Sequence, residues 1–388
     1  MTKLHHALCV PLFVAITFCP GVSSAATIYA KSGYPSDLQA AINSAHTGDT
    51  VSIPAGRFSF RGSVMAPDGI YIRGAGRDST YLIKADNTSN FMIFVDTTTG
   101  MPFKFSGITM QGRLDALQGS NRTTAVTSIT DGGLYIRGAA TNFQIFNSRF
   151  TKFLRAGIEF QGDAGTRQGP QRGVIYGNEF IDNWYVSLGY GVAVDGSAST
   201  WSKPVTLGTA NAVFVEDNLF DKNRHCVTAT NAAIYVARYN RVEDTYQESQ
   251  SFDAHGLTEA WPRGTRAVEI YKNTTTNSTM TWAGAGIRGG SGVIWGNSFS
   301  GVSHGVVLSL EPPPSSHPLQ AYPALDQIGD PNDLYIWGNT SSGVGLYLNP
   351  TSDPHGIDYW LKAGRDYFTT AKPGYTPYTY PHPLRSGS

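Results

Sequence analysis

The chain has 388 residues, enough for one large domain or two ordinary ones, and its 29 Lys and Arg balance 29 Asp and Glu. This balance excludes the net basic charge that is typical of nucleic-acid-binding domains. Charged residues make up only 15% of the chain, against about 25% in an average globular domain, whereas Gly (43), Tyr (20) and Phe (19) are abundant. That composition favours a β-rich protein with many turns.

Residues 1–25 are typical of a secretory signal peptide. A weakly basic start (3–6) is followed by an apolar stretch (7–19) and by small residues suited to cleavage (23–25). The apolar stretch is shorter than the about 20 residues of a spanning helix, and no other segment is apolar enough to span a membrane. Cleavage leaves Cys226 as the single cysteine, so no internal disulfide can form. We therefore expect a secreted or periplasmic protein.

The first structured segment is DLQAAINSAHTGDTVSIPAG, residues 37–56. Ser36 or Asp37 is expected to cap a short helix, whose apolar face is Leu38, Ala41, Ile42 and Ala45. This segment resembles the N-terminal cap of secreted right-handed parallel β-helix proteins of the pectate-lyase-like superfamily. Residues 70–86 are similar to an early coil of that family. The resemblance implies one β-helix domain over residues 26–388, with a cap at 26–60, because the open end of a solenoid core must be covered.

A short phrase of alternating apolar and polar residues recurs through the chain and ends in a polar turn residue. The turn residues are Ser148, Asn178, Asn218, Asn240, Asn273, Asn297 and Asn339. Their shortest spacings, 22 and 24 residues, indicate the basic coil, and longer spacings contain loop insertions. Alternation predicts one inward column: Ile145, Ile175, Val215, Ala237, Ile270, Ile294 and Ile336. We interpret the stacked Asn side chains as structural, because their amides can satisfy turn backbone groups of neighbouring coils.

A second strand follows each turn, with a predicted inward column of Ile158, Val192, Val227, Ala254, Ile287, Val306 and Leu346. The next position faces outward, which predicts an outer row of Glu159, Ala193, Thr228, His255, Arg288, Val307 and Tyr347. Thr228, His255 and Arg288 are then vertical neighbours about 4.8 Å apart, and Asp253 shares their face. In the family that this chain resembles, this sheet carries the binding groove.

The Tyr- and Pro-rich tail, residues 364–388, cannot form a regular helix or a central strand. We expect it to pack along the solenoid as an extended strap. Long insertions at 161–172, 195–211, 256–265 and 311–332 are expected to wall the groove. The predicted fold is all-β: a single-stranded right-handed parallel β-helix with an N-terminal capping helix and an extended C-terminal strap.

Three residues on the groove face are predicted to be catalytic: His255, Arg288 and Asp253. Cleavage of a uronic-acid polymer by β-elimination requires a cation on the carboxylate, a base for the C5 proton and an acid for the leaving oxygen. Arg288 suits a carboxylate clamp and His255 suits proton transfer. Asp253 is placed to orient His255 or to help hold a cation.

Residues predicted to bind substrate are basic or aromatic and lie near the same face: His225, Lys222, Arg224, Tyr190, Trp261, Trp282 and Arg266. They favour an acidic polysaccharide, and we expect a monomer with no nucleic-acid or membrane partner. The leading hypothesis is a secreted polysaccharide lyase. Carboxylates at Glu216, Asp217, Asp221 and 243–244 leave a Ca²⁺ site as an open alternative, and no metal ligand is assigned to the catalytic residues.

Two other functions stay open: a β-helix glycoside hydrolase and a non-catalytic polysaccharide binder. DAHG (253–256) followed one coil later by GIRGG (286–290) is similar to the polygalacturonase branch of the superfamily, but that branch's Asn-Thr-Asp and Asp-Asp motifs are absent. Hydrolysis needs two flanking carboxyl groups. Glu159 lies three predicted coils from His255, about 14 Å away, and Asp195 lies one step outside its strand. The sequence therefore favours a lyase.

Overall fold

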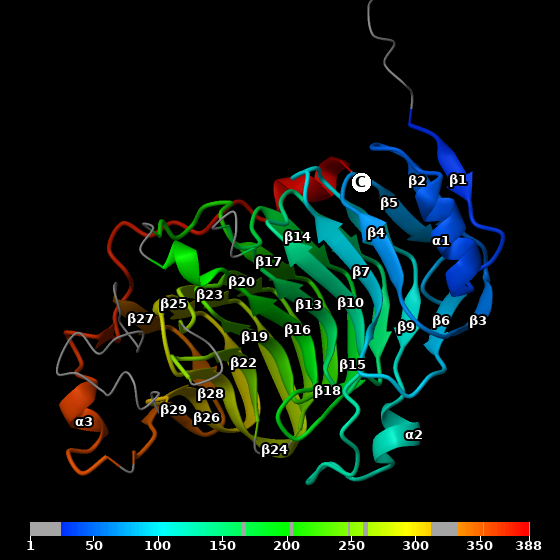
Figure 1. Cartoon of the computed structure of the whole chain (residues 1–388). Helices are drawn as coiled ribbons and strands as arrows, with labels where there is room; N and C mark the ends of the chain where they lie inside the picture. Colours follow the sequence, from blue (N-terminus) through cyan, green and yellow to red (C-terminus); the bar gives the residue numbers. More distant parts are fainter. Residues whose placement is uncertain are drawn as a thin grey trace, which may run out of the picture.

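A computed structural model describes residues 25–163, 168–201, 205–246, 249–258, 263–311, 333–351 and 353–387. These residues form a right-handed parallel β-helix whose coils stack along one axis (Figure 1). The named strands pair in parallel throughout. The predicted fold class is therefore confirmed. Within the described ranges, no helix combines the length and the apolar character that a membrane span requires.

Each complete coil contributes to three faces. The first is a 12-stranded sheet, called here the β17 sheet, which runs the whole length of the solenoid. In spatial order its strands are β1 (Thr27–Tyr29), β2 (Thr50–Ile53), β5 (Tyr71–Gly74), β8 (Lys104–Ser106), β11 (Gln144–Phe146), β14 (Gly173–Tyr176), β17 (Val213–Glu216), β20 (Ile234–Arg238), β23 (Ala267–Tyr271), β25 (Ser291–Trp295), β27 (Leu334–Trp337) and β30 (Tyr367–Phe368).

The other two faces are ladders joined by the long strands β24 (Thr274–Ile287) and β26 (Ser298–Leu308), which belong to both. The β16 ladder also contains β4 (Val64–Pro67), β7 (Phe91–Thr97), β10 (Gly132–Gly138), β13 (Ala156–Gln161), β16 (Tyr190–Asp195), β19 (His225–Thr230), β22 (Gln250–Ala254) and β29 (Val344–Leu348). The β18 ladder also contains β3 (Gly56–Phe60), β6 (Thr80–Lys84), β9 (Thr109–Gln111), β12 (Arg149–Thr151), β15 (Glu179–Asn183), β18 (Leu219–Asn223), β21 (Arg241–Thr245) and β28 (Thr340–Ser341).

Helices are few and short: α1 (Pro35–Asn43), α2 (Leu114–Gln118), α3 (Ile357–Trp360) and the 3₁₀ turns η1 (Ala198–Thr200) and η2 (Pro383–Gly387). Helix α1 covers the N-terminal end of the solenoid and buries Leu38 and Ile42 against its core (Figure 1). Its first residue is proline, which suits a first helical turn. The predicted cap by Ser36 or Asp37 is wrong, since Tyr34 occupies the N-cap without a side-chain hydrogen bond.

The predicted column of turn residues forms a continuous ladder of amide side chains. Asn240 illustrates the pattern: its Nδ2 donates to the oxygen of Val215 (2.8 Å) and to Oδ1 of Asn273 (3.0 Å), while its Oδ1 accepts from Asn218. Equivalent bonds link the column from residue 148 to residue 339. Beside it, the predicted inward column pairs in register, strand by strand. Both predictions are confirmed.

The register of the β16 ladder differs from the prediction at two places. Val227 pairs with Phe252, and not with Ala254 as predicted. A shift of two positions keeps the same side chains inward, so alternation alone cannot detect it, and the large Phe252 fills the core position. Asp253 therefore stacks on Thr228 in place of His255. A second shift of two makes Ala285, and not Ile287, the partner of Val306.

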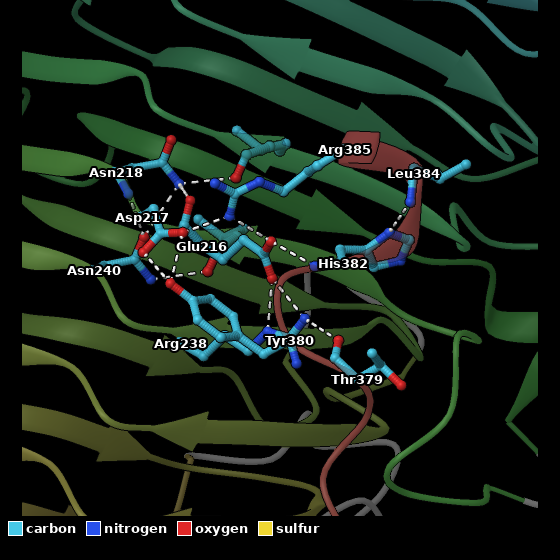
Figure 2. Close-up of polar contacts among 12 residues, drawn as sticks. Glu216, Asp217, Asn218, Arg238, Asn240, Thr379, Tyr380, His382, Leu384 and Arg385 are labelled. Atoms are coloured by element: carbon cyan, nitrogen blue, oxygen red, sulfur yellow. Dashed lines mark hydrogen bonds and ion pairs between the residues drawn. The ribbon is translucent and has the colours of Figure 1, made fainter. Parts of the chain in front are cut away.

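The strap first adds β30 to the end of the β17 sheet, and residues 375–385 then pack on the outer face of that sheet (Figure 2). Its contacts centre on a buried ion pair in which Arg238 donates to Glu216 at 2.7 Å. Glu216 also accepts from the Arg385 guanidinium (2.8 Å) and from the backbone N–H of His382 (2.9 Å). The tail thus closes over charged groups that the sheet alone would leave facing solvent.

Candidate active site

Two rows of side chains face outward from the β16 ladder, between inward residues that lie in the core. The middle row contains Phe94, Tyr135, Glu159, Ala193, Thr228 and Asp253. The upper row, two positions further along each strand, contains Asp96, Arg137, Gln161, Asp195 and Thr230. His255 continues the upper row, and Arg288 lies next to it because Ala254 pairs with Ile287. The proximity predicted for His255 and Arg288 is confirmed.

A pocket of about 300 Å³ opens over the middle of these rows. Its walls include Glu159, Asp195, His255 and Glu311. Glu159, expected to lie too far from His255 to act with it, thus lines the same pocket, and Asp195, expected one step outside its strand, lies within β16. Asp195 is the last residue of β16 and faces outward, so its carboxyl group reaches the same space as Glu159 on the neighbouring strand.

Asp195 is an acid adapted to carry a proton near neutrality. Asp195 is only 6% exposed, and Asn231 Nδ2 donates a hydrogen bond to its Oδ1 at 2.8 Å. Burial, and then the negative charge of Glu159, raise the pKa of Asp195 to about 7, although Asn231 and Arg155 act in the opposite sense. A carboxyl group with such a pKa can act as a general acid at pH 7.

Glu159 has the opposite environment. Arg155 grips both of its oxygens, with Nε–Oε2 at 2.8 Å and Nη2–Oε1 at 2.6 Å. Glu159 is thus part of a two-point ion pair, the geometry in which Arg binds carboxylates most strongly. Arg155 was not predicted as a site residue, because strand alternation does not fix the direction of a side chain in the turn before β13.

Asp253, His255 and Arg288 form one polar network with Glu311. Arg288 Nη2 lies 2.7 Å from Asp253 Oδ2 and 2.8 Å from His255 Nε2, and its Nη1 lies 2.9 Å from Glu311 Oε2. Asp253 is fully buried, which by itself would raise its pKa, but the positive charge of Arg288, together with smaller contributions from His255 and His225, outweighs burial and holds that pKa well below its usual range. The guanidinium predicted to clamp a substrate carboxylate is thus already placed between two carboxylates of the chain.

The predicted substrate-binding residues separate into different environments. Tyr190 lines the pocket and stacks on His225 with ring centroids 5.7 Å apart. His225 is buried, and burial lowers its pKa to about 3, so it is neutral at ordinary pH. Lys222 and Arg224 lie at the corner between β18 and β19 and do not line the pocket.

The remaining predicted residues lie away from this pocket. Trp282 packs its ring against the edge of His304. Arg266 donates to the backbone oxygen of Trp201 (2.7 Å) and lines a separate cavity of about 230 Å³. Trp261, most of the predicted signal peptide and most of the predicted 311–332 loop lie outside the described residues. Glu311, the first residue of that loop, was not predicted as a site residue. The only indication in the sequence is an acidic residue shortly after the groove strand that ends at residue 308.

Several buried polar atoms around the pocket have no hydrogen-bond partner among the described residues. They are Thr230 Oγ1, Asn231 Oδ1, His225 Nε2 and Arg288 Nε. Buried polar atoms in proteins are nearly always bonded, so a group of exceptions calls for an explanation. Of these four residues only Thr230 lines the pocket, and the other three contact residues that line it.

Two of the carboxylates considered for Ca²⁺ are engaged by side chains of the strap and of the β17 sheet. Glu216 is bonded to Arg238, and Asp217 to Arg385 and Tyr380 (Figure 2). Across the described ranges, no group of three or more His, Cys, Asp or Glu side chains is arranged to hold a metal ion. A calcium requirement stays a prediction, which a chelator would test.

No family model matches the sequence. No curated protein matches it either. Similar solved structures include ORF18 of Geobacillus virus E2, with a TM-score of 0.52 and 11% identity over 84% of this chain and 60% of that one. An alginate lyase from Paenibacillus sp. str. FPU-7 has a TM-score of 0.45 and 14% identity over 84% of this chain and 98% of that one. A polygalacturonase from Erwinia carotovora ssp. carotovora has a TM-score of 0.42 and 13% identity over 85% and 94%. At 11% identity the likeness to ORF18 concerns the fold alone, and it agrees with the parallel β-helix that the strand pairing of this chain shows.

Proposed function

We propose that the chain is a carbohydrate-active enzyme that hydrolyses a polysaccharide in the pocket over β13, β16 and β19. One observation carries the proposal: Asp195, with a pKa of about 7, faces the same pocket as Glu159, whose two oxygens are both paired with Arg155. Paired carboxyl groups whose environments separate their protonation states are what glycoside hydrolysis requires. Because a fold hosts many functions, the proposal depends on this pocket and not on the β-helix.

In the proposed reaction, Asp195 donates its proton to the glycosidic oxygen as the bond from that oxygen to the anomeric carbon breaks. Glu159 accepts a proton from a water molecule whose oxygen bonds to the anomeric carbon. The two residues are one strand and two positions apart, about 8 Å between Cα atoms by strand geometry, which leaves space for a sugar linkage between them. Proton exchange with solvent then returns Asp195 to the acid form and Glu159 to the carboxylate.

β-Elimination on a uronic-acid polymer is the second candidate, and one contact favours it: His255 lies 2.8 Å from Arg288 at the edge of the pocket. There His255 would remove the C5 proton, and a guanidinium would neutralise the uronate. The pairing of Arg288 with Asp253 and Glu311 weakens this candidate, because its charge is already balanced within the chain. Export through residues 1–25 and a monomeric state remain predictions.

The test is to incubate the purified protein with neutral and uronic-acid polysaccharides while following reducing ends and ultraviolet absorbance. Hydrolysis produces reducing ends without absorbance, whereas β-elimination also produces an absorbing unsaturated sugar. Asp195→Asn and Glu159→Gln should each lower kcat at least about 100-fold, the scale of general acid–base catalysis. Glu269→Gln is the control. Glu269 is also a buried carboxyl group whose pKa is raised by burial, but it lies on the β17 sheet, so this variant should retain activity. If the ultraviolet absorbance rises in proportion to the reducing ends, the reaction is β-elimination and the proposed hydrolysis is wrong.

A further inference from the structure

We infer that the substrate of this pocket is an uncharged polysaccharide. The inference rests on the proposed function and names the class of substrate for it. It departs from the acidic polymer expected from the sequence. The grounds are the pairing of charges on the outer face of the β16 ladder and the kind of polar atom that faces the pocket.

Each arginine on this face is matched by a carboxylate of the same face. Arg137 binds Asp96 through two bonds, Nε–Oδ1 at 2.7 Å and Nη2–Oδ2 at 2.9 Å. The same kind of two-point pair joins Arg155 to Glu159. Arg288 is bonded to Asp253 and Glu311 together. The guanidinium forks that could bind a sugar carboxylate are therefore engaged.

Among the described residues of this face, carboxylates outnumber guanidinium groups once these pairs are removed. Glu311 and Asp253 share a single arginine, and Asp195 has no arginine of its own among the described contacts. A uronate entering the pocket would meet Glu311, and it would also meet the charge of Asp195 once that acid ionises, above about pH 7. Like charges brought together during binding cost free energy and slow association. Lys222 and Arg224 do not change this balance inside the groove, since they line neither the pocket nor the cavity beside it.

The polar atoms beside Asp195 that lack a partner in the described ranges suit hydroxyl groups, and a ligand would reach them after a side-chain movement, since both are closed off from solvent. Thr230 Oγ1 and Asn231 Oδ1 are buried beside Asp195 without partners in the described part of the chain. The Asn231 oxygen can only accept a hydrogen bond, and the Thr230 hydroxyl can both donate and accept. A sugar hydroxyl can donate to the first and exchange a bond with the second, whereas a carboxylate can only accept.

A second cavity lies beside the pocket along the solenoid axis, and two of its charged side chains also form an ion pair. It measures about 580 Å³ and is lined by the Arg137–Asp96 pair and by Gln161. Gln161 pairs with Asp195 in the register of β13 and β16, so the cavity begins where the pocket ends. A linear neutral chain could thus continue from the Asp195 pocket over Gln161, at about 4.8 Å per coil.

The test measures binding by Asp195→Asn, which should bind substrate without cleaving it, to soluble neutral glucans, mannans and galactans and to two polyuronates. Affinity gel electrophoresis and calorimetry at low and high salt provide the readouts. We expect at least one neutral polymer to bind with little effect of salt, and the polyuronates to bind at least tenfold more weakly. Polyuronate binding equal to or tighter than that of every neutral polymer, or no binding of any neutral polymer, would overturn the inference.

A charge change at the edge of the groove gives a second readout. Asp96→Asn leaves Arg137 unpaired, so polyuronate affinity should rise by up to about fivefold at low salt, the contribution of one exposed ion pair, and return to the parent value at high salt. The matched variant Arg137→Gln should show no such rise. Release of reducing ends from a polyuronate without absorbance would overturn the neutral substrate and leave hydrolysis standing. Absorbing products would overturn the proposed reaction as well.

Discussion

Glu216→Gln tests the buried ion pair that joins the β17 sheet to the C-terminal strap. Both side chains of the Glu216–Arg238 pair are fully buried, with Nη2–Oε2 at 2.6 Å. The amide has nearly the same shape as the carboxylate, so the substitution removes the charge with little change in packing. Arg238 then keeps its hydrogen bonds to the carbonyl oxygens of Tyr378 and Thr379 but has no counter-charge.

The expected loss is large because a buried charge left alone cannot be solvated. Breaking a buried pair by removing one partner costs about 3–5 kcal/mol of stability. Asp217→Asn is the matched control: it is the same chemical change, one residue along, on a carboxylate that also binds Arg385 but is 29% exposed. Solvent screening should limit its cost to about 1 kcal/mol or less.

The assay is unfolding in guanidinium, followed by circular dichroism, together with limited proteolysis of the strap. Glu216→Gln should unfold at a clearly lower denaturant concentration than Asp217→Asn, and its tail should be cut earlier. Equal midpoints for the two variants would refute the assignment of the strap's stability to the Glu216–Arg238 pair.

Three further predictions follow from the same contacts. Asn240→Leu should cost about 3 kcal/mol, because the N–H of Asn218 and the oxygen of Val215 lose their partner; a loss below about 1 kcal/mol in denaturant unfolding would contradict the Asn ladder. Burial lowers the His225 pKa to about 3, so the unfolded chain binds more protons than the folded chain between pH 6.5 and 3. The stability that neutral His225 contributes is therefore complete above this window and falls by on the order of 4 kcal/mol by pH 3, and His225→Phe should lack this slope. Hydrolytic kcat/KM should fall as pH rises through about 7, since burial raises the Asp195 pKa to that value and the acid must be protonated; a rate that increases with pH across this range would exclude Asp195 as the acid.

The repeating parts of the fold were predictable because they follow a local rule. Each Asn of the ladder makes the same bonds to the coil before it, so one residue type recurs at one turn and its spacing reveals the coil. The inward column from Ile145 to Ile336 follows equally from strand alternation. A third strand in each coil was missed, since segments such as Glu179–Asn183 are short and partly polar.

The candidate site was only partly predictable because it depends on register and on contacts between distant segments. A slip of two residues at Phe252 preserves alternation, so the sequence could not tell whether Asp253 or His255 stacks on Thr228. Asp195 was set aside because its strand was expected to end earlier. Glu311 reaches Arg288 from a loop, and no periodic pattern reports such a contact.

The central claim, hydrolysis between Asp195 and Glu159, is tested most directly by cleavage in water enriched in the heavy oxygen isotope, with mass spectrometry of the products. Hydrolysis adds one water per bond and places the solvent oxygen at the new reducing end. We predict labelled, saturated products from the wild-type protein and at least about 100-fold less label per unit time from Asp195→Asn. Unlabelled products with an unsaturated end, or labelling by Asp195→Asn at the wild-type rate, would contradict the account.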